Sequence, residues 1–83
     1  MTETVIEYRK SPRRRVFKAA TIVFNHAGID CTVRNISEGG ACLEVAAPVG
    51  IPDSFNLVMV TDHSAHSCRV AWRSEHRIGV AFQ

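Results

Sequence analysis

Two arginines near the start of the chain have a spacing that suits ligand recognition. They are Arg9 and Arg13, in the stretch Arg9-Lys-Ser-Pro-Arg13. Pro12 fixes its own φ and pushes Ser11 toward extended geometry, so the distance between the two guanidinium groups is partly pre-set. In an extended chain their α-carbons would lie about 13 Å apart on the same side. Guanidinium groups bind phosphate with paired hydrogen bonds, recognise guanine O6 and N7, and stack on bases. The pair therefore suits a ligand with several phosphate or purine groups.

The stretch Asn35-Ile-Ser37-Glu-Gly39-Gly40 predicts a turn at the end of a strand. Consecutive glycines permit positive φ and carry no side chain, so a ligand can approach the backbone amides. Asn35 and Ser37 have the same parity as Val33, which predicts that their polar ends project beside one another. A plain hairpin closed by an Asx-type turn is the alternative explanation for the same residues.

Basic residues are concentrated around the arginine pair. The chain has ten lysines and arginines and a net charge of only +2, and six of the ten lie in this stretch: Arg9, Lys10, Arg13, Arg14, Arg15 and Lys18. A local cluster on a nearly neutral domain predicts an anionic ligand or surface. The alternative is a solvated arm that keeps a small protein soluble.

Length and composition predict one globular domain, with 83 residues, 46% hydrophobic and 22% charged. No uncharged apolar run approaches the roughly 18 residues that cross a bilayer. The acidic start "MTETVIEYRK" does not suit a signal peptide, and three cysteines without a close pair suit a reducing compartment. We therefore expect a cytoplasmic protein with no membrane association.

Alternating apolar and polar residues predict strands and almost no helix. Ile29, Cys31 and Val33 share one face of their run, and Ala41, Leu43 and Val45 share another. The six runs are "KAATIVFN", "IDCTVRNIS", "ACLEVA", "SFNLVMV", "HSCRVAWRS" and "RIGVAFQ". Six short strands joined by close turns predict an all-β fold, and a small antiparallel barrel avoids the exposed edges of an open sheet.

Together, "RKSPR" and "NISEGG" resemble the signature of the PilZ domain family, Arg-x-x-x-Arg followed by Asp/Asn-x-Ser-x-x-Gly. The segments "CTVRNISEGGACLEV" and "CRVAWRSEHRIGVAF" are similar to that family's central hairpin and closing strands, so the resemblance covers residues 7–83. It implies a six-stranded antiparallel barrel that binds the bacterial second messenger cyclic di-GMP. We assign residues 1–14 to a flexible basic arm and residues 15–83 to the barrel.

The resemblance also implies which residues bind the ligand. Arg9 and Arg13 would take guanine and phosphate, while Asn35, Ser37 and Gly40 would form the opposing wall. Four further residues are secondary candidates for contact with the ligand: Tyr8, Arg14, Gly39 and Trp72. For Trp72 a place in the core is the alternative, and we prefer that alternative on the sequence alone.

Two departures from the family pattern lie outside the five signature positions. Tyr8 stands where many members have an arginine, and such an arginine tends to accompany binding of a stacked pair of ligands. We therefore expect one ligand per chain. No residues follow Gln83 in this sequence, so we expect the barrel without the C-terminal helix that some members add.

Other kinds of site are less well supported. His63, His66 and Cys68 are close in sequence, but the chain lacks a Cys-x-x-Cys pair, so we expect no metal site. No motif pairs a nucleophile with a base, so we expect neither an enzyme nor a cofactor.

Two other functions remain as alternatives. A small barrel that binds RNA or single-stranded DNA would interleave basic residues with exposed aromatic ones, and only Tyr8 and Phe17 lie near the arm. We therefore expect no nucleic acid partner. The other alternative is a PilZ-like adaptor that has lost its nucleotide and binds only a protein. With or without the nucleotide, we expect a downstream protein partner.

Overall fold

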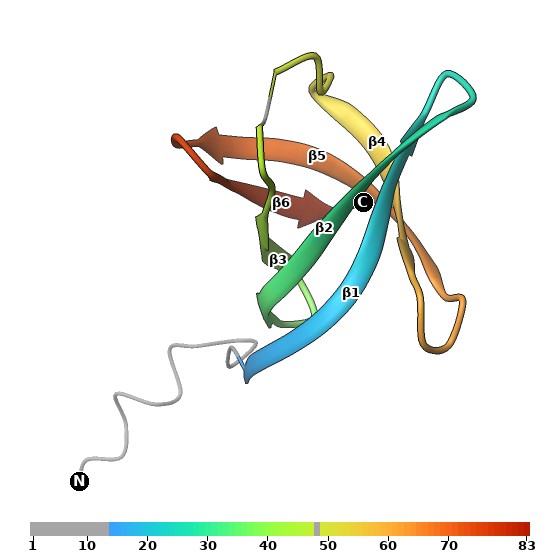
Figure 1. Cartoon of the computed structure of the whole chain (residues 1–83). Helices are drawn as coiled ribbons and strands as arrows, with labels where there is room; N and C mark the ends of the chain where they lie inside the picture. Colours follow the sequence, from blue (N-terminus) through green and yellow to red (C-terminus); the bar gives the residue numbers. More distant parts are fainter. Residues whose placement is uncertain (1–13, 48) are drawn as a thin grey trace, which may run out of the picture.

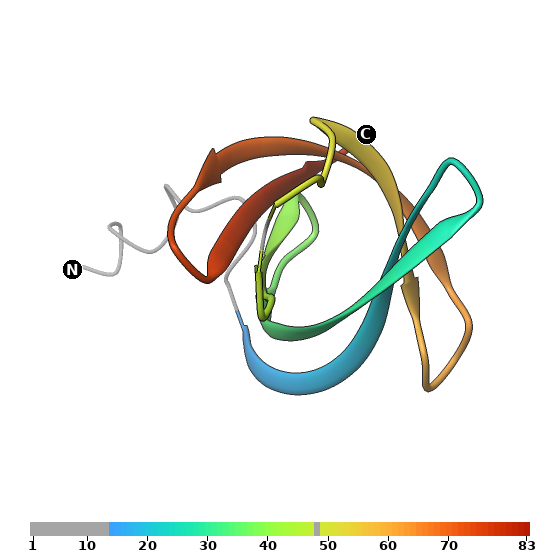
Figure 2. The ribbon, with the colours of Figure 1, turned by 45° about the horizontal axis from the view of Figure 1, so that its top comes forward.

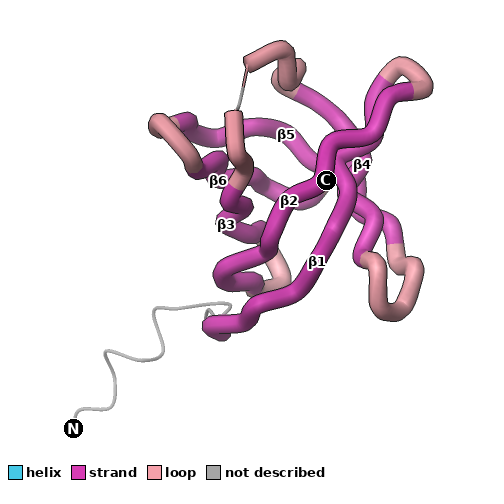
Figure 3. Tube along the Cα trace, viewed as in Figure 1, coloured by secondary structure: helices cyan, strands magenta, loops and turns pink. Residues whose placement is uncertain are grey.

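The computed structural model describes residues 14–47 and 49–83 (Figure 1). Across these ranges the regular elements are all strands, and loops connect them (Figure 3). The strands are β1 (Arg14–Phe24), β2 (Ala27–Ile36), β3 (Gly40–Glu44), β4 (Ser54–Met59), β5 (Ala65–Arg73) and β6 (Arg77–Phe82). Each of the six predicted runs corresponds to one of them.

The strands form a closed barrel in the order β1-β2-β3-β6-β5-β4, and each neighbouring pair is antiparallel. Figure 2 shows the strands curving around in a ring. Pairing of β1 with β4, with Ala20 opposite Met59, closes it. Closure gives each strand two neighbours, which removes most of the exposed edges of a small sheet. The predicted six-stranded antiparallel barrel is confirmed.

The largest fully buried side chains come one from each strand and form the centre of the core: Ile22, Val33, Leu43, Leu57, Cys68 and Ile78. Cys31 and Val33 of β2, Leu43 of β3 and Val45 just after β3 are buried as predicted, and Cys42 on the opposite face of β3 is buried as well. No polar or charged side chain is buried among the described residues. Burial of a large aliphatic side chain contributes about 1.5–3 kcal/mol, so this apolar interior supplies most of the barrel's stability.

Three strands carry a register shift, and each shift places an extra residue on one strand. The shifts lie between Arg15 and Lys18 on β1, between Val33 and Asn35 on β2, and between Val70 and Trp72 on β5. A bulge of this kind turns the residues that follow it toward the other face of the sheet.

The bulge in β2 changes the face on which Asn35 lies. Val33 is opposite the core residue Leu43, but Asn35 is opposite Cys42, because Arg34 is the extra residue. Residues directly opposite one another in an antiparallel pair share a face. The parity with Val33 on which the prediction for Asn35 and Ser37 was based is therefore broken at Arg34, and Asn35 lies on the outside of the barrel.

Candidate functional site

A shallow groove of about 550 Å³ lies on the outer face of the barrel across β3 and β6. Its floor consists of small residues in two facing pairs. Gly40 lies opposite Ala81, and Cys42 lies opposite Gly79. Because two of these four residues have no side chain and the other two have small ones, the outer face stays hollow along the β3–β6 pair, which leaves room for a ligand above the sheet.

Trp72 of β5 forms one wall of this groove. It is paired with Gly79, and a Cβ atom on Gly79 would lie 2.0 Å from the indole Nε1. The indole therefore lies directly across the glycine, where any side chain would displace it. Trp72 is 48% exposed, so the core position that we preferred for it is wrong. A half-exposed indole offers a flat apolar surface on which a base can stack.

Asn35 lines the groove as well, and it also lines a smaller adjoining groove of about 240 Å³. Arg15, Phe17 and Arg34 belong to the smaller groove. Asn35 reaches both because the bulge at Arg34 directs it outward. The two grooves therefore form neighbouring parts of one surface at the β2–β3–β6 end of the barrel.

The turn between β2 and β3 is held by Ser37. Its amide donates to the carbonyl of Gly40 at 2.8 Å, and its Oγ accepts from the amide of Gly39 at 3.3 Å. Both bonds lie within the turn, so Ser37 fixes the shape of the loop at the end of the groove. The hairpin that we considered as an alternative is thus present, with Ser37 holding it.

The glycines of this turn serve different purposes. A Cβ atom on Gly40 would lie 2.2 Å from the carbonyl oxygen of Val80, so β3 and β6 can approach only with glycine there. Around Gly39 no atom lies within 4 Å of such a Cβ. Neither residue uses a positive φ, and Gly50 (φ 85°) is the one described glycine that does. Gly40 is therefore required by strand packing.

Arg77 was not identified from the sequence, yet it lines both grooves. It begins β6, and its alternation with the core residue Ile78 puts it on the outer face. The three ion pairs between described residues are Arg34–Glu44, Arg73–Asp53 and His76–Glu75. None includes Arg77, which is exposed and lies opposite Glu44, a carboxylate that Arg34 already binds. The alternation of Arg77, Gly79 and Ala81 with Ile78 and Val80 was the sequence signal for it.

Arg34 is already engaged on two sides. It forms an ion pair with Glu44, and its guanidinium carbon lies 4.5 Å from the ring centre of Phe17. The hydrogen bond from Arg34, together with its charge and those of Arg77 and His76, lowers the pKa of Glu44. Arg34 therefore links β2 to β3 through its ion pair, while the side chain of the neighbouring Arg77 is exposed to solvent.

The structure brings together several of the predicted site residues. Asn35, Gly39, Gly40 and Trp72 line the groove, and Ser37 lies in the turn beside it. Arg14 begins β1 opposite Ile36, so the chain enters the barrel next to this turn. The remaining three, Tyr8, Arg9 and Arg13, lie outside the described residues.

Residues 14–47 and 49–83 also show how the acidic, histidine and cysteine side chains are distributed. No group of three or more histidine, cysteine or acidic side chains gathers there in a way that would hold a metal ion. The three cysteines are free and buried. A helix long and apolar enough to cross a membrane is not found in this part of the chain.

The fold and its groove define a small antiparallel barrel with a ligand-sized hollow on its outer face. Comparison with protein families identifies the class more closely, since the model of the PilZ domain matches residues 7–83. The chain belongs to the PilZ domain family, whose members are known to bind cyclic di-GMP. No curated protein matches the sequence.

Proposed function

We propose that this protein is a cyclic di-GMP receptor and that the groove between Asn35 and Trp72 binds the nucleotide. The observation that carries the proposal is the shape of this groove. Its floor is made of small residues, and a polar amide and a half-exposed indole stand on its two sides. A flat purine next to hydrogen-bonding groups suits such a surface.

The arginine arm supplies the other half of the proposed site. Arg9 and Arg13 bind guanine and phosphate, with Arg14 and Tyr8 beside them. Asn35, Ser37 and Gly40 form the opposite wall, together with Gly39. This assignment is supported by the position of Arg14 opposite Ile36, because the chain before Arg14 joins the barrel at the edge of the groove. Bound nucleotide then connects the arm to the sheet through charge-assisted hydrogen bonds.

The proposed role is that of an adaptor without catalytic activity. The groove is shallow and lies on the outside of the barrel, so a ligand held there stays partly visible from solvent. A downstream protein can recognise the combined surface of nucleotide, arm and strands. By linkage, a partner that prefers the liganded form tightens nucleotide binding by the same factor.

The single tryptophan of the chain provides a direct test, because its fluorescence reports on the groove. We expect cyclic di-GMP to change the emission of Trp72 and to release or absorb heat in a calorimetric titration. GMP at the same concentration and a single-stranded oligonucleotide are the controls. The proposal is wrong if cyclic di-GMP gives no heat, or if the oligonucleotide binds as well as the cyclic nucleotide.

A further inference from the structure

One part of β2 has a strand neighbour on only one side. β2 pairs with β1 along residues 27–36, but it pairs with β3 only from Thr32 to Ile36. None of the loop hydrogen bonds between described residues reaches residues 27–31. Alternate residues of a strand direct their amide and carbonyl to the same side, so this segment presents free backbone groups along one edge.

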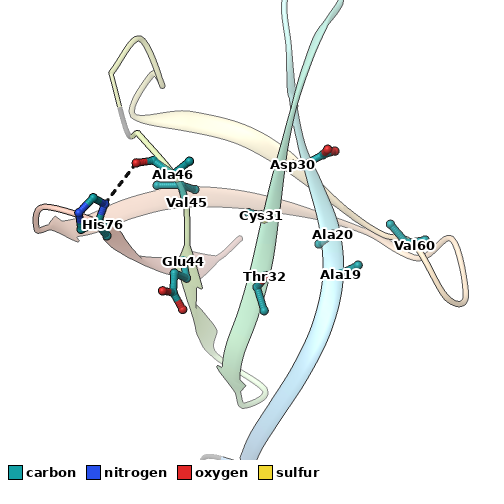
Figure 4. Close-up of a pocket in the computed structure, with 10 residues that line it drawn as sticks. All are labelled: Ala19, Ala20, Asp30, Cys31, Thr32, Glu44, Val45, Ala46, Val60 and His76. Carbon is teal, nitrogen blue, oxygen red and sulfur yellow. Dashed lines mark hydrogen bonds between the residues drawn. The ribbon is translucent and has the colours of Figure 1, made fainter.

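A groove of about 780 Å³ lies beside this edge (Figure 4). Asp30, Cys31 and Thr32 line one side of it, while Val45 and Ala46 line the other. This volume lies within the usual range of ligand pockets, about 300–1,000 Å³. The edge therefore opens onto a space large enough for a short stretch of another chain.

The far wall of this groove is held away from β2 by β6 and the residue before it. The amide of Val45 donates to the carbonyl oxygen of His76 at 2.8 Å. The Nδ1 atom of His76 lies 3.2 Å from the carbonyl oxygen of Ala46, as the dashed line in Figure 4 shows. Because these contacts direct the chain after β3 toward His76, the space next to residues 27–31 stays open.

The charge of Asp30 and the alternation of inward and outward side chains along β2 together indicate which peptide sequence would bind at this edge. Asp30 lies on the outer face, between the inward-facing Ile29 and Cys31, and forms no ion pair among the described residues. Glu44 adds a second carboxylate to the lining, although Arg34 binds it. An added strand would place alternate side chains beside Asp30 and the others toward the apolar interior. An added strand with lysine or arginine on its outer face and aliphatic residues on its inner face would complement both the carboxylate and the apolar interior.

We propose that the edge formed by residues 27–31 binds an extended, basic segment of a protein partner as an added β-strand. Main-chain hydrogen bonds give such complexes their affinity, and alternate side chains give them specificity. A second copy of this chain suits the edge less well. Antiparallel pairing of two such edges around Asp30 would place two carboxylates side by side, which is destabilising.

This surface is separate from the proposed nucleotide site. The residues that line the groove beside β2 include none of those that line the groove between Asn35 and Trp72. A protein partner can therefore bind at the edge whether or not the nucleotide groove is occupied. The proposal does not depend on cyclic di-GMP as the ligand.

A synthetic peptide tests the proposal without a known partner. The probe is Lys-Val-Lys-Val-Lys-Val-Lys with blocked ends, added to the isotopically labelled full chain and followed by NMR. We expect the free amides among residues 27–31 to shift and to exchange more slowly with solvent. A matched peptide with glutamate for lysine should bind about tenfold more weakly, since like charges then face Asp30.

Two controls separate strand addition from simple charge attraction. The lysine peptide methylated on alternate backbone nitrogens keeps its charge but loses half of its donors, so it should fail to protect these amides. Asp30→Lys should reverse the preference between the lysine and glutamate peptides, whereas Glu38→Lys, the same charge change in the β2–β3 turn, should not. The proposal is overturned if the methylated peptide binds equally well, if no amide of residues 27–31 is protected, or if the free protein pairs through this edge with itself.

Discussion

Arg77 is the described cation best placed to serve the nucleotide groove. It lines both halves of the surface and has no acidic partner among the described ion pairs. We expect Arg77→Ala to weaken cyclic di-GMP binding by about 1.5–3 kcal/mol, the usual size of a lost hydrogen bond to a charged group. Calorimetric titration of the parent and the variant with cyclic di-GMP measures this loss of binding free energy. Arg73→Ala removes the same charge from a residue that binds Asp53, so unchanged affinity in that control and a loss in Arg77→Ala would isolate the site.

The arm and the turn should contribute unequally to binding. If Arg13 binds the nucleotide as proposed, Arg13→Ala would remove a bidentate, charge-assisted contact and should cost about 2–4 kcal/mol of binding free energy. Ser37→Ala removes a neutral hydroxyl and should cost about 1 kcal/mol. Both are read from titrations with cyclic di-GMP. Parent-like affinity in Arg13→Ala would show that the arginine pair is not the ligand clamp.

Three glycine substitutions distinguish structural from binding roles. Gly40→Ala brings a Cβ atom against the backbone of Val80 and should lower the free energy of unfolding by about 1–3 kcal/mol. At Gly79→Ala the three atoms nearest to the new Cβ all belong to the indole of Trp72, so the substitution should displace that side chain and reduce nucleotide affinity more than stability. Gly39→Ala has open space and is the matched control. Thermal unfolding and Trp72 fluorescence report the two effects, and equal destabilisation in all three would contradict this division.

At the scale of the elements, alternation in the sequence was enough to predict the strands and their inward faces. Val33, Leu43 and Ile78 illustrate this, because burial of every second residue is a local pattern. The bulges were not predicted, since the extra residue Arg34 is defined by its pairing with β3 and carries no local signal of its own. For the same reason the place of Trp72 was missed. It depends on a glycine in a different strand, which propensity and periodicity do not reveal.

The ion pair between Arg34 and Glu44 links β2 to β3 and should make stability depend on pH. Because the pKa of Glu44 is lowered in the folded protein, its contribution is present above the ordinary glutamate pKa. The contribution is lost as the pH falls through the lowered value. We expect Glu44→Gln to lower the thermal midpoint at neutral pH and to converge with the parent in strong acid. Glu75→Gln, at an exposed carboxylate beside His76, is the control, and parallel curves for Glu44→Gln and parent would refute the prediction.

At the scale of the whole molecule, the proposed site requires the arm and the barrel to act together. The sequence of residues 1–14 offers few apolar groups to offset the entropy of ordering it, and in the proposed site the nucleotide supplies those contacts. We expect amide exchange in residues 8–14 to slow when cyclic di-GMP is added, as measured by hydrogen-exchange mass spectrometry. Peptides from β4 serve as the internal reference. Strong protection of residues 8–14 before any ligand is added would contradict the proposal that the nucleotide connects the arm to the sheet.

The closed strand order also has a consequence for how the chain folds. Four of the six pairings join strands that are adjacent in sequence, but β1–β4 and β3–β6 bring distant segments together, as in Ala20 with Met59. The chain must first lose the conformational entropy of closing a long loop before such distant contacts can stabilise it. A barrel of this kind therefore folds more slowly than a helical protein of equal length. The local hairpins can form early. Closure along β1 and β4 then completes the barrel, and the rate of that step sets how long unpaired strands remain exposed to aggregation after synthesis.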